Sequence, residues 1–173
     1  MLKYVDAKVV FAEVPDEVTL AINISNCPCQ CKGCHSSYLA QDIGKLLTIG
    51  SLLNLIESNK GISCVAFMGG DSDPKRVNSL AWAIKKKYPN LKTAWYSGRQ
   101  ELSKDINLEN FDYIKLGPYR EEFGPLNSRT TNQRFYKVDK LRPEETPTGE
   151  EDWVLIDITN RFYDRDLEAN YRI

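Results

Sequence analysis

Two kinds of hydrophobic pattern alternate along the chain. Short apolar and β-branched runs predict strands, and apolar residues repeating every three or four positions predict helices. Helices are expected at 49–58, with Thr48 as the N-cap, at about 74–88, with Pro74 in the first turn, and as a short piece near 101–104. Strands are expected at 4–11, 18–25, 62–68, 92–96, 113–116, 134–138 and 153–158.

The order of these elements predicts an α/β fold. A Pro-Asp turn between the first two strands predicts an N-terminal hairpin at 1–25. From there to residue 116 strands alternate with helices, which predicts right-handed crossovers and a mostly parallel sheet. The direction of the strands beyond residue 119 is left open. We expect a single domain over 1–173, with an irregular acidic loop at about 142–152.

Four polar or glycine-rich segments each follow a predicted strand. They are the cysteine-rich stretch 26–38, Gly69-Gly70-Asp71, Ser97-Gly98 and Gly117-Pro118. Because the carboxyl ends of parallel strands meet at one edge of a sheet, these segments are expected on one rim. They form a single candidate site.

Charge and hydropathy limit the possible partners and location. Lysine and arginine total 23 against 24 acidic residues, for a net charge of -1, so no basic field predicts nucleic-acid binding. The apolar runs are far shorter than the roughly 20 residues of a bilayer-spanning helix, so no membrane association is expected. Residues 1–10 lack the pattern of a secretion signal, and the cytoplasm is the expected location.

The most informative stretch holds four of the five cysteines and the single histidine. Cys27, Cys31 and Cys34 form the spacing C-x3-C-x2-C. Three thiolates on a short loop predict a four-iron four-sulfur (4Fe-4S) cluster whose fourth iron is open to a ligand. A disulfide framework is disfavoured by the odd cysteine count, structural zinc by the lack of a second separated cysteine pair, and a ferredoxin-like carrier by the missing closing cysteine. Cys29 lies outside the pattern and has no assigned role.

This spacing resembles the signature of the radical S-adenosylmethionine (SAM) superfamily. The resemblance implies a partial, open (β/α) barrel, metal ligation by Cys27, Cys31 and Cys34, and chelation of the open iron by the amino and carboxylate groups of SAM. Gly69-Gly70-Asp71 is similar to the family's Gly-Gly-Glu segment, which holds the SAM amino group, although aspartate replaces the commoner glutamate. Ser97 resembles a small polar residue that lines the SAM site. His35 is expected beside the adenine or a cluster sulfur, with a satisfied polar loop residue as the alternative.

Three further segments point to one group within this superfamily. Gly117-Pro118-Tyr119, the run Asn132-Gln133-Arg134 and the sequence Cys-Lys-Gly-Cys-His at 31–35 are similar to activating proteins of anaerobic ribonucleoside-triphosphate reductases. The likeness covers roughly residues 18–136. It implies that a one-electron donor such as flavodoxin or ferredoxin reduces the cluster. SAM is then cleaved to methionine and a 5'-deoxyadenosyl radical, which takes a hydrogen atom from a glycine of the reductase large subunit.

Two other functions stay open. Small radical SAM enzymes that make deazapurines from pterin-derived metabolites place a magnesium-binding hydroxyl two residues after the third cysteine, where this chain has Ser36. A noncatalytic zinc or iron-sulfur interaction module is the alternative from another class. Cys64, Trp82 and Trp95 lie within apolar patterns and are expected in the core.

Overall fold

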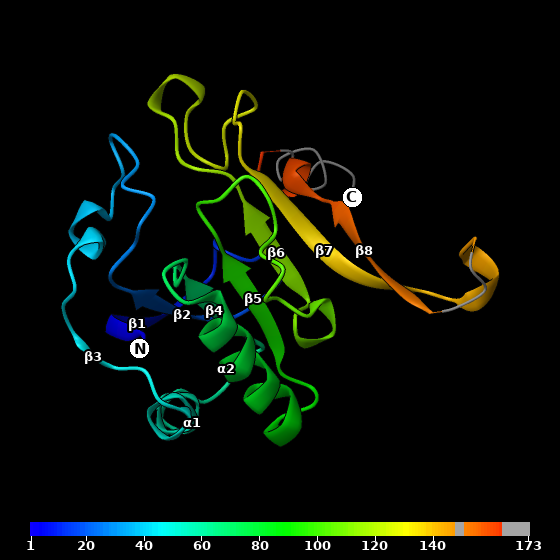
Figure 1. Ribbon diagram of the computed structural model, residues 1–173, viewed down its shortest axis with the longest axis horizontal. Helices are drawn as coiled ribbons and strands as arrows, with labels where there is room; N and C mark the ends of the chain where they lie inside the picture. Colours follow the sequence, from blue (N-terminus) through cyan, green and yellow to red (C-terminus); the bar gives the residue numbers. More distant parts are fainter. Residues whose placement is uncertain (148–150, 164–173) are drawn as a thin grey trace, which may run out of the picture.

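The computed structural model describes residues 1–147 and 151–163. Its strands form one mixed sheet of eight, in the order β3-β1-β2-β4-β5-β6-β7-β8. Two helices, α1 (Ile49–Ser58) and α2 (Pro74–Lys87), accompany the sheet (Figure 1). The strands are β1 (Lys3–Val10), β2 (Thr19–Ile24), β3 (Lys45–Leu46), β4 (Cys64–Met68), β5 (Lys92–Tyr96), β6 (Tyr113–Leu116), β7 (Arg134–Leu141) and β8 (Asp152–Asp157).

The α/β class is confirmed, but the expectation of a mostly parallel sheet is wrong. Three pairings, β2–β4, β4–β5 and β5–β6, are parallel, whereas the four pairings that flank them are antiparallel. Crossovers through α1 and α2 account for the parallel β2–β4 and β4–β5 pairings, and β5 and β6 are joined by a segment with a 3-10 turn at Leu108–Asn110. Within the described residues the sheet stays open, with β3 and β8 at its two edges.

Local sequence signals fix both helices. Thr48 caps α1 by accepting a hydrogen bond from the backbone N–H of Ser51, whose side chain accepts in return from the N–H of Thr48. In α2 the cap is Asp73, which accepts from the N–H of Arg76, and proline occupies the first turn. The predicted inward residues of α2 are all buried: Val77, Leu80, Ala81 and Ile84.

The core lies mainly between the sheet and the helices, which cover one face of it (Figure 1). Along β4 the side chains alternate, with Val65 and Phe67 in the helix-side core and Cys64 and Ala66 in a smaller cluster on the opposite face. All four are fully buried, which confirms the prediction of a strand enclosed on both faces. The parallel strands therefore form a rigid platform for the loops at their ends.

Several details differ from the sequence expectations. Residues 101–104 are not helical, because Ser103 closes a turn by accepting from the N–H groups of Asp105 and Ile106. Trp82 is 50% exposed on the outer side of α2, with the ammonium of Lys86 over its ring, so its assignment to the core is wrong. Trp95 and Cys64 are buried as expected.

The expected acidic loop lies between β7 and β8 and contains a 3-10 turn, Pro143–Glu145. Its residues 148–150 fall outside the described part of the chain. Among residues 1–147 and 151–163, no helix has both the length and the apolar character needed to cross a membrane.

Candidate functional site

The four segments expected on one rim do meet there. They follow β2, β4, β5 and β6, which are consecutive neighbours in the sheet. The contacts between them are specific: Cys29 Sγ lies 3.7 Å from Asp71 Oδ2, Asp71 Oδ2 accepts from the N–H of Gly98 at 2.9 Å, and the N–H of Gly117 donates to the carbonyl of Arg99 at 2.6 Å. The rim is thus a connected hydrogen-bonded unit.

The cysteine loop is closed at its neck by the backbone. The N–H groups of Asn26 and Cys27 donate to the carbonyls of Gln41 and Leu39, each at 2.9 Å. Within the loop, the N–H of Cys34 donates to the carbonyl of Cys31 at 3.2 Å, a turn that brings these two cysteines together. These bonds fix the ends of the loop and one turn within it.

Three of the loop's cysteines line one cavity. Cys27, Cys31 and Cys34 line a space of about 200 Å³, together with Gln30, Ser36, Ser37 and Ala40, whereas Cys29 does not line it. All three cysteines are free and partly buried. Thiolates on a 4Fe-4S cluster each bind a different iron and surround a common volume, so this donor set fits such a cluster.

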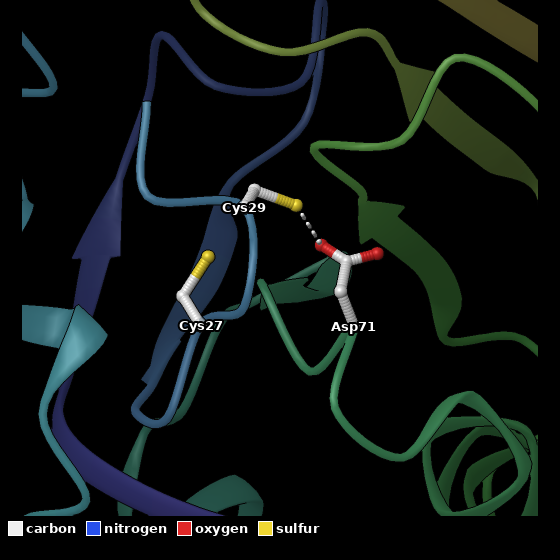
Figure 2. Close-up of side chains that lie close together, drawn as sticks. All are labelled: Cys27, Cys29 and Asp71. Carbon is white, nitrogen blue, oxygen red and sulfur yellow. Dashed lines mark hydrogen bonds between the residues drawn. The ribbon is translucent and has the colours of Figure 1, made fainter. Parts of the chain in front are cut away.

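Cys29 points toward Asp71, which follows β4, and its sulfur lies within 4.8 Å of the Cys27 sulfur (Figure 2). Gly98 permits this approach, because a Cβ at that position would lie 2.7 Å from Cys29 Sγ. A hydrogen bond from Cys29 lowers the pKa of Cys27 to about 6, which favours its thiolate at neutral pH. The same bond, with burial and the nearby Asp71, raises the pKa of Cys29 and keeps it protonated in the metal-free protein.

Gly69 and Gly70 both require conformations that favour glycine, with φ of 97° and 91°. A Cβ on Gly70 would also lie 2.6 Å from Val77 Cγ2. The carbonyl of Gly69 accepts from the indole Nε1–H of Trp95 at 2.8 Å. Since a carbonyl oxygen has two lone pairs, one remains for a ligand.

Asp71 and Ser97 are almost fully buried, each 1% exposed. Ser97 Oγ donates to Asp71 Oδ1 at 2.6 Å, and the guanidinium of Arg99 donates to the Asp71 carbonyl at 3.1 Å. Their polar atoms therefore bind one another across the ends of β4 and β5. This arrangement positions the two loops.

The sequence analysis missed Lys115, the most buried cation near the rim. Its side chain is on β6 and the residue is 7% exposed, and Nζ donates to the carbonyls of Gly117 at 2.5 Å and Ser97 at 3.3 Å. Burial lowers the pKa of Lys115 to about 8, while the charges of Cys31 and Asp71 act in the opposite direction. A lysine inside a short strand gave no sequence signal, because the strand pattern alone does not tell which polar side chain is enclosed.

Asn132-Gln133-Arg134, which had no physical explanation in the sequence, supports the turn at Gly117-Pro118. Asn132 Nδ2 donates to the carbonyl of Pro118 at 2.9 Å, and a Cβ on Gly117 would lie 3.1 Å from Gln133 Cα. Arg134 Nη1 donates to the carbonyls of Thr131 and Gln133. The motif holds in place the turn that faces the cysteine loop.

No family model, no curated protein and no solved structure matches this chain. What the site can do chemically therefore follows from its own donor atoms, cavities and charges.

A second cavity adjoins the cysteine loop. Its volume is about 550 Å³, and it is lined by Cys29, Cys31, Lys32 and residues 118–122. His35 is exposed, with its ring centroid 6.0 Å from that of Tyr119. His35 thus lies near the segment that follows β6. A ligand in the second cavity, next to Cys31, would also contact Tyr119.

Proposed function

We propose that this protein is a radical SAM activating enzyme, with its open sheet serving as a partial (β/α) barrel of the radical SAM type. The proposal rests on the positions of the four clustered cysteines. Cys27, Cys31 and Cys34 line one cavity at the carboxyl rim of the parallel strands, whereas Cys29 does not line it and contacts Asp71. Three thiolates with no fourth cysteine ligand suit a 4Fe-4S cluster that keeps one iron for SAM.

Each part of the rim has a task in this proposal. Cys27, Cys31 and Cys34 would hold the cluster, which when bound supplies the electron for reductive cleavage of SAM. The Gly69 carbonyl, oriented by Trp95, offers its remaining lone pair to the SAM ammonium, and the bare Cα atoms of Gly69 and Gly70 permit close approach. Asp71 and Ser97 hold these loops in register.

Lys115 contributes charge balance. A cluster with three thiolates is anionic, and the buried ammonium is electrostatically coupled to Cys31, Cys29 and Cys34. In a site of low polarity such a cation stabilises nearby negative charge more strongly than it would in water. We assign Lys115 to this stabilising role, and His35 with Tyr119 to the boundary of the SAM site.

A protein substrate suits the open architecture. The sheet formed by the described strands stays open, and the cavity of about 550 Å³ beside Cys31 is large enough to admit a chain segment from a partner. The Gly-Pro-Tyr and Asn-Gln-Arg segments, which are similar to those of reductase activating proteins, are joined by the hydrogen bond from Asn132 to the Pro118 carbonyl, and Pro118 and Tyr119 line that cavity. We therefore infer that the partner is the large subunit of an anaerobic ribonucleoside-triphosphate reductase, on which a glycyl radical is formed, with flavodoxin or ferredoxin as electron donor.

The position of Ser36 favours a second candidate function. Ser36 lines the same cavity as the three cysteines, as a magnesium-binding hydroxyl of a deazapurine-forming enzyme would. Such an enzyme would act on a free metabolite and would need Ser36 for magnesium-dependent turnover. The activating enzyme would tolerate Ser36→Ala in glycyl-radical formation.

The test is glycyl-radical formation with purified components under anaerobic conditions. The reconstituted protein, SAM, a reductant and the reductase large subunit are combined, and the radical is quantified by electron paramagnetic resonance together with 5'-deoxyadenosine. The proposal expects both products from the wild type and from Cys29→Ala, and neither from Cys31→Ala. Deoxyadenosine formation without any protein radical, whichever reductase subunit is supplied, would count against the activating role.

A further inference from the structure

Cys29 belongs to a second group of potential metal ligands. The thiol sulfurs of Cys27 and Cys29 and a carboxylate oxygen of Asp71 all lie within 4.8 Å of one another (Figure 2). Within the described residues, it is the one group of three or more potential ligand atoms with such short separations. It shares only Cys27 with the cavity of the three cysteines.

The spacing in this group matches a single ion. A tetrahedral zinc site with Zn–S of about 2.3 Å and Zn–O of about 2.1 Å places a sulfur and an oxygen ligand about 3.6 Å apart. Cys29 Sγ and Asp71 Oδ2 are 3.7 Å apart. These two side chains therefore already have the separation that one bound cation requires, and Cys27 Sγ needs only a small movement to join them.

The carboxylate has the surroundings of a metal ligand. Asp71 is 1% exposed, and each of its oxygens is oriented by a donor, Oδ1 by Ser97 Oγ at 2.6 Å and Oδ2 by the N–H of Gly98 at 2.9 Å. Carboxylates that bind metals are characteristically held by such outer hydrogen bonds. The guanidinium of Arg99 forms a long ion pair with Oδ1, with its Nε at 3.9 Å. Oδ2 is the carboxylate oxygen that faces Cys29.

We propose that Cys27, Cys29 and Asp71 bind a single divalent cation of the zinc class. Two thiolates and one carboxylate suit Zn²⁺, and three protein ligands leave a fourth position for water or another small ligand. Because Cys27 serves both sites, bound zinc and the cluster exclude each other. The cation site is independent of the proposed function, whereas the exclusion depends on it.

Cobalt(II) is the probe, since it replaces zinc and its thiolate complexes absorb visible light. Full-length, reduced apoprotein is titrated with Co²⁺ without oxygen, and Zn²⁺ is then added as competitor. One Co²⁺ per chain is expected, with sulfur-to-cobalt charge-transfer bands that zinc abolishes. Cys29→Ser and the nearly isosteric Asp71→Asn should each weaken binding by at least about tenfold. Far-ultraviolet circular dichroism checks that both variants remain folded.

Cys34→Ser is the matched control, because it removes a cluster ligand and leaves the cation ligands intact. It should bind Co²⁺ as tightly as the wild type, yet assemble no cluster, whereas Cys29→Ser should assemble the cluster and lose Co²⁺. If Cys34→Ser loses Co²⁺, or Cys29→Ser keeps it, or the wild type takes up none, the cation site is wrong. Failure of the wild type to assemble a cluster while this cobalt pattern holds would reject the proposed function and the exclusion alone.

Discussion

Replacing Asp71 tests how the rim is held together. Asp71→Ala removes the acceptor of two short hydrogen bonds, from the buried Ser97 Oγ and from the partly buried N–H of Gly98, and also the longer contact with Cys29 Sγ at 3.7 Å. Hydrogen bonds to a charged group contribute about 1.5–3 kcal/mol each, so the free energy of unfolding should fall by about 3–6 kcal/mol. Asp71→Asn keeps the shape and can still accept from Gly98, so its loss should be about 1–2 kcal/mol.

Urea unfolding of the reduced, metal-free protein, followed by circular dichroism, measures these changes. Asp105→Ala, at an exposed aspartate of the same rim, is the control and should stay within about 0.5 kcal/mol of the wild type. An Asp71→Ala variant as stable as the control, with an unchanged m-value, would refute the idea that this buried carboxylate joins the loops after β4 and β5.

Three further predictions concern single groups. Burial lowers the pKa of Lys115 to about 8 from its ordinary 10.5. At pH values between these two, the unfolded chain therefore binds more protons than the folded chain. The apoprotein should therefore gain about 2 kcal/mol of unfolding free energy from about pH 7.5 to pH 9.5, and Lys115→Met should lose this gain. Alkylation of Cys27 by iodoacetamide, followed by peptide mass spectrometry, should titrate near pH 6, and Cys29→Ala should move the midpoint upward. Thr48→Ala should cost about 1 kcal/mol in urea unfolding, whereas Thr48→Ser retains the cap.

Each of these has a contrary result. A pH-dependent gain of equal size in Lys115→Met would assign the effect to other groups, such as the thiols. A Cys27 midpoint that does not move in Cys29→Ala would remove the hydrogen bond as its cause. Equal stability of the alanine and serine variants at position 48 would show that the cap contributes nothing.

Local sequence signals were sufficient for most of the secondary structure. The predicted bounds of α1, β5 and β6 coincide with those of the structure, since the Thr48 cap and the polar residues that follow the apolar runs mark element ends clearly. The direction of β7 and β8 was not predictable, because a strand pattern specifies faces but not which end of a neighbour it meets. Trp82 shows the same limit for a helix, since an apolar residue beside the buried stripe can lie outside it.

The candidate site was predictable in outline but not in its contacts. Rules on strand order placed the four rim segments together, and the structure agrees. The contact of Cys29 with Asp71 depends on the bare Cα of Gly98, 27 positions along the chain from Asp71, and no spacing rule connects these residues. Lys115 was missed for a similar reason, because its partners are carbonyls brought near by the sheet. Such long-range polar contacts arise from tertiary structure.

The most direct test of the proposed function is electron paramagnetic resonance of the anaerobically reconstituted, reduced protein, recorded with and without SAM. We expect the signal of a reduced 4Fe-4S cluster held by Cys27, Cys31 and Cys34, and a change in that signal when SAM binds the open iron. A cluster signal indifferent to SAM, or a protein that takes up zinc and no iron, would contradict it and favour an interaction module.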